Sequence, residues 1–214
     1  MSPILPGEKV AGVVLAGGRA RRMGGGDKML MAAGGRSLLA HVVARARPQT
    51  AALLLSANGD PSRFAAFGLP VVADGVAGGA AGQGGPLAGI LAGMEWVRNS
   101  WPQIRWLAGF AADTPLLPVD LVPRLAAAVA ESGADLGCAA SGGVRHHIFG
   151  LWPVRLADAL RRALVEEDLR RVGAWMARYR VAEAEWPGGA ADPFLNVNTA
   201  ADLDELRRRL DEPG

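Results

Sequence analysis

Short aliphatic segments alternate with amphipathic ones between residues 10 and 132, and this alternation restricts the fold more than any other feature of the sequence. The aliphatic segments have the length and composition of buried strands, and the amphipathic ones have helical periodicity. Strands are predicted at residues 10–15, 51–58, 70–74 and 104–113, and helices at residues 37–47, 61–67, 86–97 and 119–132. This order favours an α/β fold with a mostly parallel sheet that is covered on both faces.

The order changes after Ser132. Two strand-like segments are separated by the turn signal Ser-Gly-Gly at residues 141–143, which predicts a hairpin or antiparallel edge added to the sheet. The remaining predicted elements are helices at residues 154–167 and 170–179, a strand at 181–186 and a helix at 200–210. Thr199 can cap this last helix together with Asp202.

The 214-residue chain is half hydrophobic, which is enough for one compact domain or at most two small ones. Its single cysteine, Cys138, excludes an intramolecular disulfide, and its first ten residues lack the layout of a signal peptide. No apolar run approaches the ~18 residues of a membrane span. A net charge of +2, with no RNA-recognition or zinc-ligand pattern, argues against nucleic-acid binding. We therefore expect a cytoplasmic protein.

The stretch LAGGRARRMGGGDK, from Leu15 to Lys28, follows the C-terminal end of the first predicted strand, where open α/β folds bind ligands. Its glycines let backbone N–H groups approach phosphate oxygens, and Arg22 and Lys28 can supply positive charge. The stretch contains neither G-x-G-x-x-G nor the Ser or Thr that follows a Walker lysine. It predicts a polyphosphate-binding loop of another kind, with a solvated surface loop as the alternative.

A carboxylate follows the fourth predicted strand, in the segment FAADTPLLP. There Asp113 would lie at the C-terminal edge of the sheet, close to bound phosphates, and could hold Mg²⁺. A turn or helix-cap aspartate is the alternative. Asp120 directly precedes the next helical pattern, so we assign the cap of that helix to Asp120.

Polar residues also follow the second and third predicted strands. Ser56 and Asn58 end one of them and Asp74 ends the other, so each could hydrogen-bond a base or ribose, although such residues commonly form turns. Asn196 and Asn198 alternate along an extended segment, which predicts that both amides face the same way. A shared ligand would explain this arrangement, and satisfaction of the loop's own polar groups is the alternative.

Three further features of the sequence could contribute to a binding site. The helix that begins in GGPLAGI, residues 84–90, would expose backbone donors to an anion. The glycine- and alanine-rich segment from Gly75 to Gly85 is either mobile or a lid. His146 and His147 are adjacent in a predicted strand, so they should point to opposite faces, with one facing a substrate and the other in solvent; a metal pair is not expected.

Taken together, these segments resemble the nucleotidyltransferases, and within them the molybdenum cofactor guanylyltransferases. The resemblance rests on LAGG, RRMGG and DK between Leu15 and Lys28, and on GPLAGI, DTPLLP and NVNT in the same order, so it covers essentially the whole chain. It implies a three-layer α/β fold of one domain. Residues 1–133 would form a Rossmann-like nucleotide-binding half, and residues 134–214 the half that binds the pterin acceptor.

The resemblance also implies a reaction, in which GMP is transferred from GTP to the phosphate of molybdopterin with release of pyrophosphate and a requirement for Mg²⁺. By matching segment, the residues implied to contact the guanine nucleotide are Leu15, Ala16, Gly17, Gly18, Lys28, Ser56, Asn58, Asp74 and Asp113. Asp113 would also bind the metal. The residues implied on the pterin side are Pro86, Leu87, Ala88, Gly89, Asn196 and Asn198. One departure is that Ser56 stands where the family often has asparagine, with Asn58 two residues later.

Charge explains how such a reaction would be catalysed. Two anions must meet, so Mg²⁺, Lys28, Arg22 and loop amides would neutralise and align them, and no protein nucleophile is needed. Molybdenum-insertion proteins and acceptor molybdoenzymes or their chaperones are implied partners. The alternatives are a cytidylyltransferase acting on the same pterin, a sugar-phosphate nucleotidyltransferase and a non-catalytic carrier of the cofactor. LAGG rather than LAAG, together with GGGDK, favours guanine.

Overall fold

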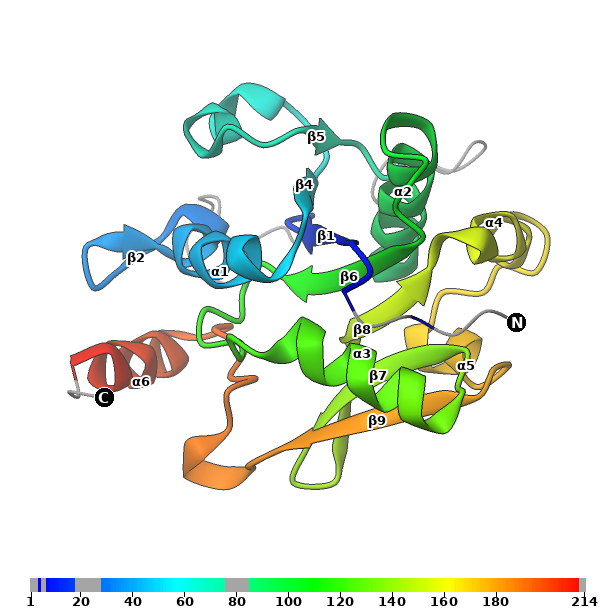
Figure 1. Ribbon diagram of the computed structural model, residues 1–214. Helices are drawn as coiled ribbons and strands as arrows, with labels where there is room; N and C mark the ends of the chain where they lie inside the picture. Colours follow the sequence, from blue (N-terminus) through cyan, green and yellow to red (C-terminus); the bar gives the residue numbers. More distant parts are fainter. Residues whose placement is uncertain (1–3, 5–6, 18–27, 76–84, 212–214) are drawn as a thin grey trace.

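The computed structural model describes residue 4 and residues 7–17, 28–75 and 85–211. Within them, seven strands form one sheet in the order β5-β4-β1-β6-β8-β7-β9, and β2 and β3 form a small separate ribbon (Figure 1). The strands are β1 Val10–Leu15, β2 Ala32–Ala33, β3 Arg36–Ser37, β4 Ala52–Ser56, β5 Val71–Val72, β6 Trp106–Ala111, β7 Leu136–Ser141, β8 Val144–Pro153 and β9 Val181–Trp186. The α-helices are α1 Leu38–Ala46, α2 Gly85–Ser100, α3 Leu121–Ser132, α4 Ala157–Val165, α5 Val172–Met176 and α6 Ala200–Asp211.

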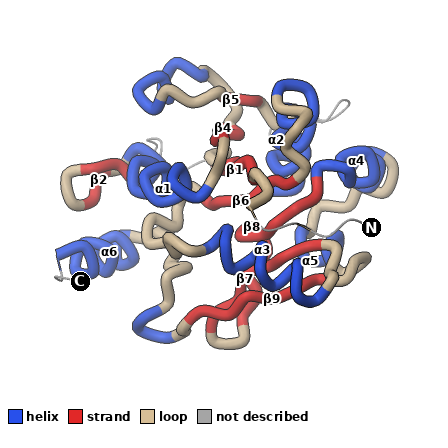
Figure 2. The backbone as a smooth tube through the Cα atoms, viewed as in Figure 1, coloured by secondary structure: helices blue, strands red, loops and turns tan. Residues whose placement is uncertain are grey.

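The sheet is mixed. Strands β5, β4, β1 and β6 pair in parallel, while β8 runs antiparallel to both of its neighbours, β6 and β7. The hairpin predicted between β7 and β8 is confirmed, and its turn residues Gly142 and Gly143 have φ of 54° and 78°, which suits glycine in a two-residue hairpin loop. Figure 2 shows the strands crossing the middle of the molecule from β5 to β9. Since β9 pairs in parallel with β7, the antiparallel strand lies inside the sheet.

Helices cover both faces of the sheet, which confirms the α/β class and its three layers. On one face, α1 and α3 pack over apolar residues of the sheet such as Val14, Phe110 and Leu151. On the other face, α2, α4 and α5 pack over a second core that includes Val13 and Trp152. Helix α6 packs on α1 and the β2–β3 ribbon through a smaller cluster. Among the described residues, no helix has the length and hydropathy needed to span a bilayer.

The predicted elements form, several with shorter bounds. Residues 61–67 make a 3₁₀ helix, the third predicted strand shrinks to Val71–Val72, and the helix expected at 154–167 begins as a 3₁₀ turn, Val154–Leu156, before α4. The helix expected at 170–179 is reduced to α5. The remaining 3₁₀ turns are Lys28–Leu30, Arg47–Gln49 and Gly189–Ala191.

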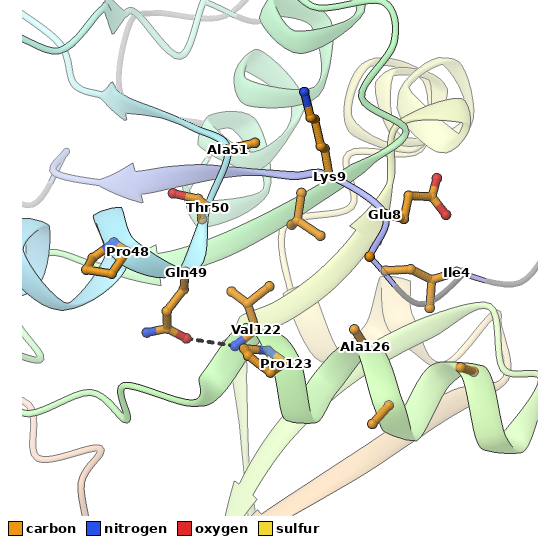
Figure 3. A pocket seen from close by; sticks show the side chains of 14 residues that line it. Ile4, Glu8, Lys9, Pro48, Gln49, Thr50, Ala51, Val122, Pro123 and Ala126 are labelled. Atoms are coloured by element: carbon orange, nitrogen blue, oxygen red, sulfur yellow. Dashed lines mark hydrogen bonds between the residues drawn. The ribbon is translucent and has the colours of Figure 1, made fainter.

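The start of α3 corrects one prediction. Asp120 occupies the N-cap position, but its side chain makes no capping bond and its carboxylate accepts from the indole N–H of Trp186 at 3.1 Å. The amide Oε1 of Gln49 accepts from Val122 N–H at 2.9 Å instead, as Figure 3 shows. The helix end is thus capped from another element, which the local sequence does not reveal. A hollow of about 610 Å³ lies beside this bond, and Lys9 and Thr50 are among its lining residues.

Candidate active site

The carboxyl ends of three parallel strands meet at one place on the sheet edge. Leu15 at the end of β1 lies in register with Ser56 of β4 on one side and with Ala111 of β6 on the other. Backbone hydrogen bonds continue past the strands, from Ala16 N–H to Ser56 O at 2.8 Å and from Ala112 N–H to Leu15 O at 3.2 Å. The loops that leave these strands therefore start side by side, as expected for a ligand site in an open α/β sheet.

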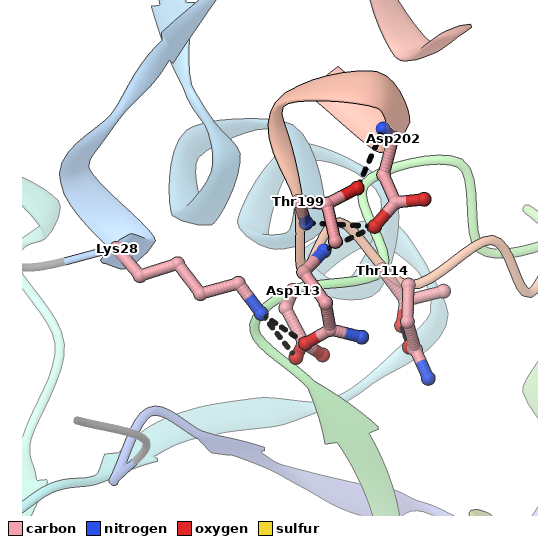
Figure 4. A network of polar contacts seen from close by, with 7 residues as sticks. Lys28, Asp113, Thr114, Thr199 and Asp202 are labelled. Atoms are coloured by element: carbon pink, nitrogen blue, oxygen red, sulfur yellow. Dashed lines mark hydrogen bonds and ion pairs between the residues drawn. The ribbon is translucent and has the colours of Figure 1, made fainter. Parts of the chain in front are cut away.

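Lys28 lies at this edge, next to the end of β6. Its ammonium group is 2.9 Å from Asp113 Oδ2 and 2.7 Å from Asn198 Oδ1 (Figure 4). The side chain of Lys28 is only 9% exposed and that of Asp113 is 24% exposed. A nearly buried lysine needs such partners, because an uncompensated charge there would be costly. The structure thus brings together three predicted site residues that lie 85 and 170 positions apart in the chain.

Hydrogen bonds between the loop after β6 and residues 196–198 hold Asp113 and Asn196 in place. Val197 N–H donates to Asp113 O at 2.9 Å, and the fully buried Thr114 donates its hydroxyl to Asn196 Oδ1. Both asparagines are exposed residues on either side of the buried Val197. The amide oxygen of Asn196 therefore accepts from Thr114 in the loop after β6, and that of Asn198 accepts from Lys28. Both bonds agree with the alternative of internal polar satisfaction, and they leave the amide NH₂ groups able to donate to a ligand.

Helix α6 fixes the end of this segment. Asp202 Oδ2 accepts from the backbone N–H groups of Asn198 and Thr199, each at 2.8 Å, and Thr199 Oγ1 accepts from Asp202 N–H at 3.2 Å. The predicted reciprocal cap is confirmed. The bond from Asn198 N–H, with those from Thr199, lowers the pKa of Asp202. The cap ties the position of Asn198, and through it Lys28, to the start of the helix.

A second polar group of the edge combines Asn58 and Asp74. Asn58 Oδ1 accepts from Asp74 N–H at 3.2 Å, so two predicted nucleoside contacts lie together. Asp74 Oδ1 is buried and has no hydrogen-bond partner among the described residues. A Cβ on Gly17 would lie 4.0 Å from Asp74 Oδ2, so the backbone at Gly17 lies close to this carboxylate. A buried oxygen that lacks a hydrogen-bond donor can accept a hydrogen bond from a ligand.

Ser56 and helix α2 have a packing role. Ser56 is 2% exposed, and a Cβ on Gly89 would lie 2.9 Å from its Oγ and 2.7 Å from Leu15 Cδ2, so only glycine lets α2 approach β1 and β4 this closely. Leu87 and Ala88 are also buried. Of the α2 residues predicted on the pterin side, only Pro86 is exposed. Any ligand contact from this turn would come from Pro86 and the first-turn backbone.

Asp113 suits a magnesium ion that is shared with a substrate. The described residues contain no group of three or more His, Cys, Asp or Glu side chains able to hold a metal by themselves. Mg²⁺ usually keeps several waters and binds one or two carboxylates together with substrate phosphates. One carboxylate at the sheet edge, next to a lysine, fits that mode of binding.

Two predicted residues and one predicted segment lie outside the described residues: Gly18, Arg22 and positions 76–84 of the lid candidate. Sequence reasoning missed Thr114, whose only signal was its place directly after Asp113. The two histidines point to opposite faces, as predicted: His146 stacks on Phe194, with ring centroids 4.3 Å apart, and His147 packs against Gly173 of α5. Both are half-buried, which corrects the expectation that one lies in solvent.

Comparisons with known proteins identify the family. Residues 12–182 match the family described as MobA-like NTP transferase domain. A molybdenum cofactor guanylyltransferase of Bradyrhizobium sp. is 56% identical over 199 residues, covering 93% of this chain and 92% of the relative. The chain belongs to the molybdenum cofactor guanylyltransferase family. A second member, from Nitrobacter hamburgensis, is 50% identical over 197 residues and 92% of each chain. The resemblance seen in the sequence is thereby confirmed, and the protein is a nucleotidyltransferase.

Solved structures confirm the fold. Molybdopterin-guanine dinucleotide biosynthesis protein A from Archaeoglobus fulgidus superposes with a TM-score of 0.70 at 20% identity, covering 94% of this chain and 98% of that chain. A 4-diphosphocytidyl-2C-methyl-D-erythritol synthase from Anaerococcus prevotii gives a TM-score of 0.71 at 11% identity, covering 98% and 99%. Proteins with different names share this fold, so the fold alone does not decide which base is bound.

Proposed function

We propose that this protein transfers GMP from GTP to the phosphate of molybdopterin. An oxygen of the acceptor phosphate attacks the α-phosphorus of GTP, the bond between the α-phosphorus and its bridging oxygen to the β-phosphate breaks, and pyrophosphate leaves with the electron pair. The observation that carries the proposal is the cluster of Lys28, Asp113 and Asn198 at the carboxyl edge of the sheet, in a chain of this family.

Lys28 and Asp113 would act through charge. Lys28 can turn its ammonium group from Asp113 to the nucleotide phosphates and neutralise the oxygens of the transferring group. Mg²⁺, held by Asp113 and the phosphates, would supply further neutralisation of that group. The chain also contributes alignment, because Asp113 is fixed through its carbonyl to Val197 and Lys28 through its bond to Asn198.

The nucleoside and the acceptor would bind on different parts of the edge. Asp74 Oδ1, which has no donor in the described part of the chain, can accept from a ribose hydroxyl or a base N–H. Asn58, whose Oδ1 is occupied, can donate from its amide nitrogen. Asn196 and Asn198 would offer amide donors to the acceptor, and Pro86 at the exposed start of α2 would be a further contact. The proposal includes that the nucleotide site binds guanine in preference to cytosine.

The test measures pyrophosphate release from Mg-GTP or Mg-CTP with molybdopterin as acceptor. We expect release with GTP only. Asp113→Asn keeps the size of the side chain and should reduce turnover by at least about a hundredfold. Asp120→Asn, in the same loop region but bonded to Trp186, is the matched control and should retain turnover. Turnover with CTP would show that the protein is a cytidylyltransferase. A fully active Asp113→Asn enzyme would exclude Asp113 as a metal ligand.

A further inference from the structure

A second polar cluster lies at the carboxyl end of β7, away from Lys28. Ser141, the last residue of that strand, is 2% exposed. Its hydroxyl oxygen is 2.6 Å from His146 Nε2 and 3.0 Å from Asp192 Oδ2. The three side chains come from β7, β8 and the chain after β9, so a buried hydroxyl joins three separate segments.

The chemistry of these groups fixes the direction of each bond. An ionised carboxylate only accepts, so Ser141 donates its proton to Asp192. The hydroxyl oxygen then accepts from His146, which must carry a proton on Nε2. Asp192 Oδ1 in turn accepts from Phe194 N–H at 2.8 Å, so both carboxylate oxygens are used. The cluster is a continuous relay from His146 through Ser141 and Asp192 to the backbone of Phe194.

Packing strengthens the same link. The His146 ring stacks on Phe194 with an interplanar angle of 21°, and Phe194 is 4% exposed and lies against Phe149 and Trp186. His146 is thus linked to Phe194 in two ways: its ring stacks on the Phe194 ring, and its Nε2 is connected to the Phe194 backbone through Ser141 and Asp192. These contacts hold Phe194 in place, and the residues that follow it in the chain lie at the candidate active site.

The chain after Phe194 carries the contacts of that site. Within four residues it supplies Asn196 to Thr114, the Val197 amide to Asp113 and Asn198 to Lys28. Its far end is fixed by the cap of α6, and Arg209 of the same helix donates to the Asp192 carbonyl at 2.8 Å. The segment 192–199 is therefore held at both ends, and the Ser141 relay holds the side chain at its first residue.

We propose that Ser141 is a positioning residue of the active site. Its hydroxyl orients Asp192 and Phe194, and so sets where the Asn196 and Asn198 amides stand. The consequence for the acceptor rests on the proposed function, because it requires that these amides face the acceptor. The effect on the segment itself does not depend on that function.

The first measurement is hydrogen–deuterium exchange of the peptide that covers residues 192–199 in the free protein. In Ser141→Ala we expect exchange of this peptide to be at least about fivefold faster, with β1 unchanged. Ser141→Thr, which keeps the hydroxyl, should restore the slow rate. Ser132→Ala removes another serine hydroxyl, bonded to Ala128 O at the end of α3, and is the matched control. Should Ser141→Ala fail to fold, Asp192→Ala tests the same link from its other side.

The second measurement separates binding from turnover. In Ser141→Ala we expect the KM for molybdopterin to rise by about tenfold or more, while the Kd of Mg-GTP rises less, because Lys28 and Asp113 keep their bond to each other. Unchanged exchange at residues 192–199, or equal losses in acceptor and nucleotide binding, would overturn the proposal. A wild-type protein that makes no guanine dinucleotide would overturn the proposed function alone, because the exchange experiment would still decide the role of Ser141.

Discussion

Replacement of Lys28 by methionine gives the sharpest test of the site's electrostatics. The substitution keeps a long apolar stem and removes the ammonium group, which lies 2.9 Å from Asp113 and 2.7 Å from Asn198. Asp113, 24% exposed, would then lack its counter-charge. The measurement is made without nucleotide or divalent cation, so that it reports the interaction of these side chains in the free protein.

The magnitude follows from the two contacts. Hydrogen bonds to charged groups contribute about 1.5–3 kcal/mol each, and part of this loss is offset because methionine is buried more easily than lysine. We expect Lys28→Met to lower the free energy of unfolding by ~2–4 kcal/mol. For a chain of this length, each kcal/mol corresponds to roughly 2–4 °C in Tm.

A double-mutant cycle isolates the ion pair. Asp113→Asn removes the negative charge and leaves an amide oxygen that can still accept from Lys28, so its cost should be smaller. If the pair is formed, Lys28→Met with Asp113→Asn should cost about 2 kcal/mol less than the sum of the single variants. The assay is equilibrium urea unfolding of the four proteins, with Lys9→Met, at the exposed second lysine, as control. Additive costs within about 0.5 kcal/mol would refute the ion pair.

Three further predictions concern packing, reactivity and pH. Gly89→Ala should destabilise the fold by ~1–3 kcal/mol in urea unfolding, because its Cβ would approach Leu15 and Ser56 to under 3 Å. A gain in stability, as for an open helical glycine, would contradict this packing. Burial raises the pKa of the Cys138 thiol to about 12, so thiol reagents should label it only after unfolding; rapid labelling of the native protein would show that it is accessible. Burial lowers the pKa of His146, so its contribution to stability is complete above the unfolded pKa of ~6.5 and is lost as pH falls below it. Stability between pH 7 and 5 should therefore change less steeply in His146→Gln, and an identical slope would argue against a neutral His146 imidazole in the folded protein.

Local patterns carried much of the fold. The aliphatic run of β1, helix α1 after its N-cap Ser37 and the Gly-Gly turn of the hairpin follow from side-chain periodicity and from glycine's access to positive φ. The cap formed by Thr199 and Asp202 was also readable, because both partners lie within one helical turn. The sequence also located Asp113 just after the carboxyl end of β6, because the aliphatic run that forms this strand ends directly before it.

Contacts between distant segments were not readable in this way. Asp120 stands where a cap belongs, yet Gln49, 73 residues away from Val122, provides the bond. The place of β8 between β6 and β7 depends on strand pairing, which local propensity does not encode. The same is true of the Ser141 relay, whose partner Asp192 lies 51 residues further along the chain.

The sequence by itself determined the alternation of strands and helices, the glycine-rich loop after β1 and the membership of a guanylyltransferase family, because each is recorded in residues that are neighbours along the chain. Only the tertiary structure decided that Lys28 is paired with Asp113 and Asn198, and that a buried oxygen of Asp74 has no donor among the residues the structure describes. Those properties depend on distance and on exclusion from water, and both arise only when the strand ends are brought together at one edge of the sheet.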